Sequence, residues 1–262
     1  MKILNGRDLA GFIKEKQAHQ VRQARGRGIK PKLLIIRDSE NPVIMKYVSL
    51  KKQYGEDIGI EVEDFCANSK TEIAAKILEA NQDEKIHGII VQLPLKTVEK
   101  AELDEVLGKI DVKKDVDGLT GETDTATAVA INWLIAGHGF DLKGLKIAIV
   151  GRGRLVGAPL IRMWTNSGYD VTVFGHDGDL AQLSNFDVIV TATGVPHLIK
   201  SEMVKPGAIV VDAGTAAENG VLVGDVDEIV REREDLKAIT PKIGGVGPLT
   251  VCALFDGVLN TI

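Results

Sequence analysis

The sequence has few cysteines and no long apolar run. Two cysteines in 262 residues are too few for a disulfide framework or a four-ligand zinc site, and their surroundings lack the spacing that either needs. We therefore expect Cys66 and Cys252 to be reduced, partly buried thiols, and we expect no metal. No apolar run approaches the ~18 residues that cross a bilayer, and the first residues soon turn polar. These absences predict a cytoplasmic protein without a signal peptide or a membrane-spanning helix.

The sequence also has no excess of positive charge. It carries 32 Lys and Arg residues against 37 Asp and Glu residues, which gives a net charge of −5. We therefore expect no attraction to nucleic acid or to an anionic membrane, and we interpret a short basic stretch at 22–32 as a solvated helix face. Hydrophobic residues make up 44% and charged residues 26%. This balance is typical of a soluble globular protein of the size of an enzyme, and the length favours two domains.

Strands and helices are expected to alternate along the chain. In the first part, the pattern predicts strands at 32–37, 59–65 and 87–92 and helices at 9–25, 44–54, 72–82 and 99–108. After a helix at 125–137, a second series has strands at 146–150, 170–174, 187–192, 208–212 and 237–239 and a last helix at 249–259. Residues 110–124 have no periodicity and mark a domain junction. The alternation predicts parallel sheets covered by helices on both faces.

A glycine-rich turn follows the strand at 146–150. Gly151, Gly153 and Gly157 occur where a strand passes into a helix, so the backbone can approach a pyrophosphate at the helix N-terminus. A tight turn without a ligand is the alternative. Asp177, at the end of the next strand, can accept hydrogen bonds from the ribose hydroxyls of NAD, whereas Arg152 can pair with the 2′-phosphate of NADP. The two residues favour opposite cofactors, so the choice between them stays open.

A tyrosine and a lysine are spaced for one face of a helix. Tyr47 and Lys51 lie one helical turn apart, and a partly buried lysine has a lowered pKa that allows proton transfer near neutrality. A surface tyrosine and lysine are the alternative. Short-chain dehydrogenases use the same pair, but there the dinucleotide turn precedes it, whereas here the turn follows. The order of the motifs therefore excludes that class.

Three further segments are unusual for plain packing. Gln92 stands at a strand end, where open α/β sheets gather ligands, and Asp117 lies in the junction, where its carboxylate can bind a heterocycle with an amidine-like pair of N–H groups. A cap or turn is an equal alternative for both residues. Residues 244–250 place three glycines and a proline before the last helix. Such a permissive backbone indicates close approach to a ligand, an interdomain hinge, or both.

Six segments in this order resemble the bifunctional methylenetetrahydrofolate dehydrogenase/methenyltetrahydrofolate cyclohydrolase family, called FolD, from the start to the end of the chain. They are Tyr47-Val48-x-x-Lys51, residues 88–95 (GIIVQLPL), 114–118 (KDVDG), 151–159 (GRGRLVGAP), 223–227 (VGDVD) and 244–250 (GGVGPLT). The resemblance implies oxidation of 5,10-methylenetetrahydrofolate by NAD or NADP. Hydrolysis to 10-formyltetrahydrofolate then follows, within one-carbon metabolism and purine biosynthesis.

The resemblance also implies a fold and an assembly. We expect an α/β fold with two α/β domains and an active-site cleft between them. Residues 1–120 with the terminal helix 248–262 would form the N-terminal substrate and catalytic domain, and residues 121–247 the C-terminal Rossmann-type NAD(P)-binding domain. The small-molecule partner is a reduced folate, and a homodimer is expected.

Individual roles follow from the same resemblance. Lys51 would be the catalytic lysine, Tyr47 would stack on or orient the pterin, Gln92 would hydrogen-bond Lys51, and Asp117 would hold the pterin ring. The substrate would also meet Leu93, Gly245 and Pro248. The residues expected to bind the cofactor are Gly151, Arg152, Gly153, Val156, Gly157, His176, Asp177, Thr193 and Gly194.

The chain departs from the family pattern at several places. Residues 42–44 (PVI) replace the usual Pro-Ala-Ser, residues 125–128 (TATA) replace Pro-Cys-Thr-Pro, and residues 256–257 (DG) replace Asn-Thr. In the cofactor region, residues 151–153 (GRG) replace Gly-Arg-Ser and residues 176–177 (HD) replace His-Ser. Two alternatives therefore stand beside the folate enzyme. One is a divergent paralogue that binds folate or a nucleotide without turnover, and the other is a two-domain enzyme similar to shikimate or amino-acid dehydrogenases.

Overall fold

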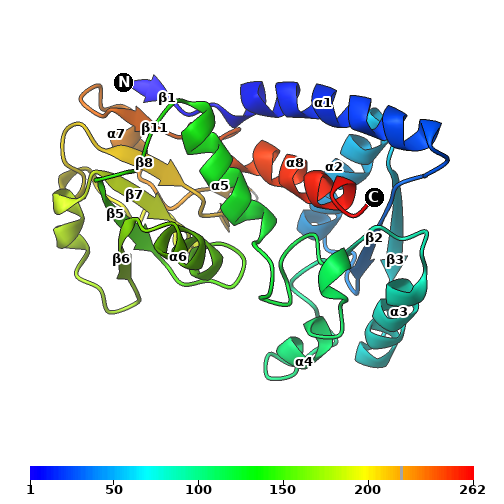
Figure 1. Cartoon of the computed structure of the whole chain (residues 1–262). Helices are drawn as coiled ribbons and strands as arrows, with labels where there is room; N and C mark the ends of the chain where they lie inside the picture. Colours follow the sequence, from blue (N-terminus) through cyan, green and yellow to red (C-terminus); the bar gives the residue numbers. More distant parts are fainter. Residues whose placement is uncertain (219–220) are drawn as a thin grey trace. The chain divides into compact units, whose positions relative to one another are not determined.

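The computed structural model describes residues 1–218 and 221–262, and the chain forms two compact units (Figure 1). We call one the six-stranded unit, which comprises Met1–Ala10 and Thr127–Thr250, and the other the three-stranded unit, which comprises Gly11–Ala126 and Val251–Ile262. The boundaries fall inside three helices, α1 (Gly6–Gly26), α5 (Ala126–Gly137) and α8 (Val246–Leu259). Each unit therefore combines stretches that are distant in the sequence.

Neighbouring strands of the six-stranded sheet are all parallel and follow the order β1-β11-β8-β7-β5-β6. They are β1 (Lys2–Ile3), β5 (Lys146–Val150), β6 (Asp170–Phe174), β7 (Val188–Thr191), β8 (Ile209–Asp212) and β11 (Ala238–Ile239). β6 and β7 lie on opposite sides of β5, so the chain reverses its direction across the sheet after β6. Ligands of open α/β sheets bind beyond the carboxyl ends of the strands at such a reversal. The topology therefore points to the ends of β5 and β7.

Helices cover this sheet and bury its strands. The longest helix that lies wholly within the unit is α6 (Gly157–Asn166), and it packs on α5 through Trp164, whose Nε1 donates to Asn132 Oδ1 at 3.3 Å. The remaining elements are α7 (Glu228–Arg231), the short 3₁₀ helices η2 (Leu180–Asn185) and η3 (Ser201–Met203), and the antiparallel strands β9 (Ala216–Glu218) and β10 (Val221–Val223). Burial on both faces explains why the central strands are continuous apolar runs.

The three-stranded unit has the parallel order β3-β2-β4. Its strands are β2 (Lys32–Arg37), β3 (Glu61–Cys66) and β4 (Gly88–Val91), and its other elements are α2 (Pro42–Ile58), α3 (Lys70–Gln82), α4 (Leu103–Leu107) and the 3₁₀ helix η1 (Val112–Lys114). α2 begins where Asn41 Oδ1 accepts the Val43 N–H at 2.9 Å, and it ends at Gly59, which adopts φ +86°. The reversal of the chain here lies between β2 and β4, so Gln92 stands at the edge where a ligand is expected.

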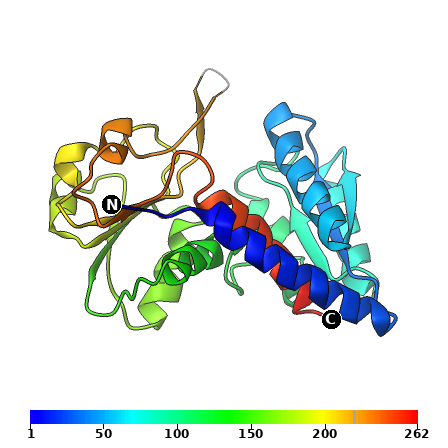
Figure 2. The ribbon, with the colours of Figure 1, turned by 90° about the horizontal axis from the view of Figure 1, so that it is seen from above.

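Helices from both ends of the chain fix α2. The last part of α1 lies beside α8 (Figures 1 and 2), where Gln17 Nε2 donates to the Cys252 carbonyl at 2.9 Å. The hydroxyl of Tyr54, on α2, donates to Gln17 Oε1 at 2.8 Å, and the Tyr54 ring stacks on Phe255 with centroids 5.0 Å apart. This contact set holds α2 against the core, and α2 carries the tyrosine and lysine predicted above.

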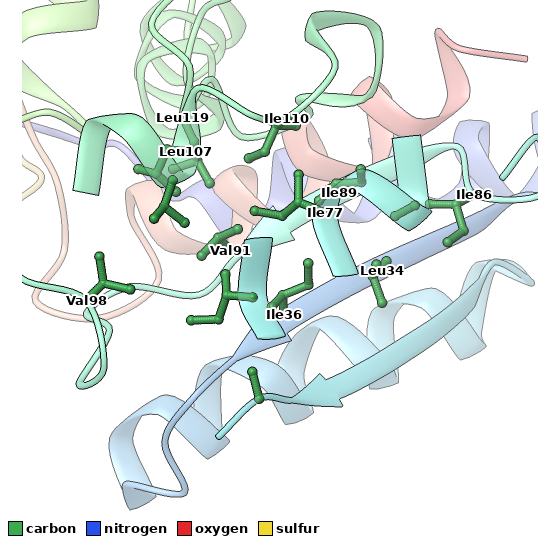
Figure 3. Close-up of a cluster of buried hydrophobic side chains, with 14 residues drawn as sticks. Leu34, Ile36, Ile77, Ile86, Ile89, Val91, Val98, Leu107, Ile110 and Leu119 are labelled. Atoms are coloured by element: carbon green, nitrogen blue, oxygen red, sulfur yellow. The ribbon is translucent and has the colours of Figure 1, made fainter. Parts of the chain in front are cut away.

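One hydrophobic cluster joins α3 to the three-stranded sheet (Figure 3). Leu34 and Ile36 of β2 and Ile89 and Val91 of β4 contribute side chains from one face of the sheet, because residues two apart point to the same side. The cluster is completed from α3, α4 and the following loop by Ile73, Ile77, Ala80, Val106, Leu107, Ile110 and Leu119, among others. The loop at 110–119 is therefore anchored in the core at both ends.

Most predicted elements occur, and the differences have local causes. The strands at 32–37, 146–150 and 170–174 have the predicted bounds. β3 begins at Glu61 rather than at residue 59, because Gly59 caps α2. The helix predicted at 99–108 is reduced to α4, and β1, β9 and β10 were not predicted because two or three residues form no readable pattern. Among the residues that the structure describes, no helix is long and apolar enough to cross a membrane.

Candidate active site

Helix α2 presents Tyr47 and Lys51 on its buried side. The buried positions of α2 recur at helical spacing, at Ile44, Val48, Lys51, Gly55 and Ile58. Lys51 is only 8% exposed, and Tyr47 is half-buried one turn earlier. A lysine in a row of apolar positions is unusual, because charged side chains are rarely buried without a partner.

The partner of Lys51 is the residue that follows β4. Lys51 Nζ donates to Gln92 Oε1 at 2.7 Å, and Gln92 Nε2 donates to the Leu93 carbonyl at 3.2 Å. The second bond fixes which end of the Gln92 amide faces the lysine. Leu93 itself is partly buried and packs against the hydrophobic cluster of Figure 3. The strand end therefore presents a neutral acceptor to the ammonium group.

Asp117 completes this group of polar side chains. Burial raises the pKa of Asp117 to about 6, and the charges of Lys51 and Asp115 act on it in opposite directions. The backbone N–H of Ala126 bonds to the Asp117 carboxylate and favours its ionised form. Burial also lowers the pKa of Lys51, against the attraction of Asp117. An amine and a carboxyl group that both titrate closer to neutrality can exchange protons with a bound molecule.

The glycine-rich turn lies at the reversal point of the six-stranded sheet. Gly151 adopts φ +103°, and a Cβ there would lie 2.6 Å from the Ala192 carbonyl oxygen, next to the end of β7. A Cβ on Gly157 would lie 2.2 Å from the Gly151 oxygen. A Cβ on Gly153 would only just reach the Ala192 carbonyl oxygen, at 4.0 Å. Within the described residues, no acceptor takes the amides of Arg152 and Gly153. Glycine-lined space with available amides before α6 fits a pyrophosphate.

The other predicted cofactor residues surround this turn. Val156 immediately precedes α6, and Thr193 and Gly194 follow β7, where Gly194 adopts φ +71°. His176 and Asp177 follow β6 and are fully exposed, with His176 Nδ1 3.7 Å from Asp177 Oδ1. The unit thus brings these residues to the carboxyl edge of three neighbouring strands.

Gly245 and Pro248 belong to the six-stranded unit. Gly245 is buried. A Cβ on Gly6 would lie 1.8 Å from the Gly245 carbonyl oxygen, so the start of α1 lies in close backbone contact with the glycine-rich segment. Pro248 lies in the first turn of α8 and is partly exposed. The substrate roles of both residues stay predictions.

Sequence reasoning gave no role to several buried or half-buried polar residues. Asp225 is fully buried, its Oδ2 accepts the Thr193 N–H at 2.7 Å, and its Oδ1 has no partner among the described residues. Lys114 and Asp115 make multiple hydrogen bonds beside Asp117. All three lie within motifs named above, residues 114–118 and 223–227, so the sequence indicates the segment and not the residue.

Fold and site together define a class of protein. A parallel sheet with a glycine turn at its reversal point is a dinucleotide-binding unit, and the other unit holds a buried lysine and an aspartate with shifted pKa values at its own reversal point. This combination is that of a two-domain, dinucleotide-dependent α/β enzyme.

Family models match both parts of the chain. "Tetrahydrofolate dehydrogenase/cyclohydrolase, catalytic domain" matches residues 4–117, and the NAD(P)-binding domain of the same family matches residues 125–262. The chain belongs to the tetrahydrofolate dehydrogenase/cyclohydrolase family.

Individual relatives agree along the whole length. The "Bifunctional protein FolD" of Lactobacillus acidophilus is 37% identical over 276 residues, covering 99% of this chain and 96% of the relative. The crystal structure of the bifunctional enzyme FolD from Campylobacter jejuni has a TM-score of 0.92 at 34% identity, covering 100% and 98% of the two chains. The Trypanosoma brucei enzyme, complexed with NADP and an inhibitor, has a TM-score of 0.89 at 29% identity, covering 99% and 96%.

These findings confirm three of the predictions. The family, the α/β fold with two domains, and NADP or NAD as the cofactor are as expected from the sequence. They support the folate enzyme and neither alternative, the paralogue without turnover or the enzyme similar to shikimate dehydrogenases. The roles of the individual site residues stay predictions.

Proposed function

We propose that this protein oxidises 5,10-methylenetetrahydrofolate with NAD or NADP and then hydrolyses the product to 10-formyltetrahydrofolate. The observation that carries the proposal is the buried Lys51, which donates to Gln92 at 2.7 Å and lies in the field of Asp117, in a chain that matches both domains of the family. The proposal keeps the predicted domains, residues 1–120 with 248–262 for the substrate and residues 121–247 for the cofactor. A boundary near residue 120 is supported by the family models, which separate between residues 117 and 125. The placement of the chain's end with the substrate domain is supported from Val251 onward, where it belongs to the three-stranded unit.

The six-stranded unit binds the cofactor. A bound oxidised nicotinamide would supply the hydride acceptor for the methylene carbon of the substrate. The amides of Arg152 and Gly153 and the first turn of α6 would hold the pyrophosphate, and the glycines keep side chains out of its path. Thr193 and Gly194, at the end of β7, line the same edge of the sheet.

The three-stranded unit binds and orients the reduced folate. The Asp117 carboxylate accepts hydrogen bonds from the N–H groups of the pterin ring, in which the amino group and the adjacent ring nitrogen form an amidine-like pair. The half-buried ring of Tyr47 provides a face on which the pterin can stack. Loss of the hydride leaves a methenyl cation, so the oxidation needs position rather than a proton acceptor.

Lys51 serves the hydrolysis. Water adds to the methenyl carbon, the ring opens at the adjacent nitrogen to give the 10-formyl group, and one proton is released overall. A lysine whose pKa is lowered by burial gives up its own proton more readily, and its free amine can take the proton from the attacking water. Gln92 holds the amine in place through its oxygen, which accepts from Lys51 in either protonation state.

We also propose that the protein works in the cytoplasm as a homodimer, on the basis of the family resemblance. Sedimentation equilibrium tests the homodimer. A mass twice that of the chain is the expected result, and the mass of a monomer would contradict it.

The activity is tested with purified protein and methylenetetrahydrofolate, separately with NAD and NADP. The absorbance of reduced cofactor and that of methenyltetrahydrofolate are followed together, and the final product is identified by chromatography. Reduced cofactor with 10-formyl product and no lasting methenyl intermediate is the expected result. Accumulation of methenyltetrahydrofolate would show that the protein lacks the hydrolase activity. No change in either absorbance with either cofactor would overturn the proposal.

A further inference from the structure

Lys114 makes an unusual set of contacts next to the proposed folate site. Its Nζ donates to the carbonyls of Ala80, Asn81 and Asp83 at 2.8, 3.0 and 2.8 Å. These carbonyls lie at the end of α3, where the helix leaves acceptors without partners and where its dipole favours a cation. Three charge-assisted bonds from one ammonium group fix its position closely.

The segment after Lys114 is held at each successive residue. The Asp115 carboxylate accepts the amides of Leu119 and Thr120, both at 2.9 Å, which closes the turn around Asp117. Asp115 also forms an isolated parallel bridge with Ile89 of β4. This bridge holds Asp115 next to β4, whose end carries Gln92. Asp117 lies two residues further along, close enough to Lys51 for each charge to act on the pKa of the other group.

The residue between the two aspartates is wedged against glycines. Val116 is 8% exposed, and a Cβ on Gly88 or Gly257 would lie 2.9 or 3.0 Å from its side chain. Residues 256–257 are Asp-Gly in this chain, where the family pattern has Asn-Thr. The missing side chain of Gly257 therefore leaves room for Val116. Ile110 and Leu119 anchor the two ends of the loop in the hydrophobic cluster (Figure 3).

A second clamp from α3 acts on the same loop. Asn81 Nδ2 donates to the Lys109 carbonyl at 2.7 Å, and Asn81 Oδ1 accepts the Asp111 N–H at 2.9 Å. The loop is thus tied to the end of α3 on both sides of Ile110, first by Asn81 and then by Lys114. Of these bonds, those of Lys114 lie nearest to Asp117 in the sequence, three residues before it.

We propose that Lys114 is a positioning residue for folate binding, which holds the Asp117 carboxylate in place by bonding its ammonium group to the carboxyl end of α3. The inference rests on the proposed function, because it takes Asp117 to be a folate ligand. Lys114 acts through Asp117, because the three bonds of its ammonium group go to carbonyls at the end of α3. Its loss lets the 114–118 segment move away from Lys51 and Gln92 without changing the cofactor unit.

The test compares two variants that weaken the same helix at opposite ends. Lys114→Met keeps an unbranched apolar stem and removes the three bonds at the end of α3. Ser69→Ala removes the cap at the start of α3, where Ser69 Oγ accepts the Glu72 N–H at 3.2 Å, and leaves the loop untouched. Lys113→Met is the control for loss of an exposed neighbouring charge. Lys114→Arg keeps a cation with several N–H groups that can donate to the same carbonyls.

Two readouts distinguish positioning from stability. The first is the Kd of tetrahydrofolate and of NADP, measured by calorimetry well below the melting temperature of every variant. We expect Lys114→Met to weaken tetrahydrofolate binding about tenfold or more, with NADP binding unchanged. Lys114→Arg should recover most of the loss, and Ser69→Ala and Lys113→Met should bind both ligands as the original protein does.

The second readout needs no folate. In carbon-13-labelled protein, the Asp117 carboxyl group, assigned with Asp117→Asn, is titrated by NMR. Lys51 of α2, Asp115 of its own segment and the Ala126 amide act on this group. We expect its pKa, raised to about 6 by burial, to fall in Lys114→Met and to stay in Ser69→Ala.

Each outcome decides one of the two proposals. If the original protein binds no tetrahydrofolate, the proposed function fails, and the titration alone decides whether Lys114 positions Asp117. If it binds tetrahydrofolate, but Lys114→Met weakens binding no more than Ser69→Ala and leaves the Asp117 pKa in place, the function stands and the positioning role is wrong.

Discussion

The Lys51 region and the glycine turn differ in what determines their binding properties, which is side-chain chemistry in the first and backbone shape in the second. Around Lys51, side chains are buried or half-buried, Lys51 bonds to Gln92, and burial shifts the pKa values of Lys51 and Asp117. At the turn, Arg152 and Gly153 are exposed. Backbone shape decides there, since a Cβ on Gly151 or Gly157 would overlap a carbonyl oxygen. One site is therefore sensitive to charge and pH, and the other to volume.

The largest expected effect comes from removing the buried amine. Lys51→Met eliminates the proton acceptor, so the rate of methenyltetrahydrofolate hydrolysis should fall by about 10²- to 10⁴-fold, the usual contribution of a general base. The oxidation needs no proton acceptor and should lose much less. Rates of both steps are measured separately, starting from methylene- and from methenyltetrahydrofolate. An unchanged hydrolysis rate in a folded variant would remove Lys51 from the mechanism.

Cofactor binding at the glycine turn should depend on the volume of the side chains there. In Gly157→Ala, the added carbon overlaps the Gly151 oxygen, and overpacking of this kind should weaken NAD or NADP binding by about ten- to a hundredfold. Folate binding should not change. Gly11→Ala is the matched control, because its Cβ meets nothing within 4 Å. Calorimetry with each ligand checks the prediction, and equal loss of both affinities would show general unfolding instead.

The pH dependence of folate binding should follow Asp117. Its folded pKa of about 6 lies above the ordinary carboxyl value, so the charged form that binds the pterin is lost as the pH falls through 6. Between pH 7.5 and pH 5, the tetrahydrofolate Kd should rise about tenfold. Asp117→Asn should bind weakly at every pH, and any titration of the ligand itself affects both proteins equally. A flat profile in the original protein would contradict the charged role of Asp117.

The smallest effect concerns the choice of cofactor. Asp177 is fully exposed beside His176, so its repulsion of a 2′-phosphate is screened by water. Asp177→Ser should raise the ratio of NADP to NAD use by roughly two- to fivefold. The values of kcat/KM for both cofactors give this ratio. A ratio that shifts toward NAD would contradict the assigned role.

The same contrast separates what the sequence predicts from what it does not. Strands such as β2 and β5 can be predicted from the sequence, because burial on both faces requires a continuous apolar run. The glycine turn can be predicted because close approach of the backbone to a ligand requires glycine itself. The motif at 47–51 places Tyr47 and Lys51 on one helix face. The contacts of Lys114 with α3 are not readable, because they join residues about thirty positions apart whose proximity only the folded chain creates. Two-residue β1 carries no pattern at all.

The proposed hydrolysis depends most on Lys51 being a buried amine with a lowered pKa. NMR of protein labelled at the lysine ε-carbons, with the Lys51 signal assigned by Lys51→Met, measures this directly. We expect Lys51 to lose its proton at a lower pH than the exposed lysines, because burial disfavours its charged form. A Lys51 signal that titrates together with the exposed lysines, or above them, would contradict the proposed role in hydrolysis.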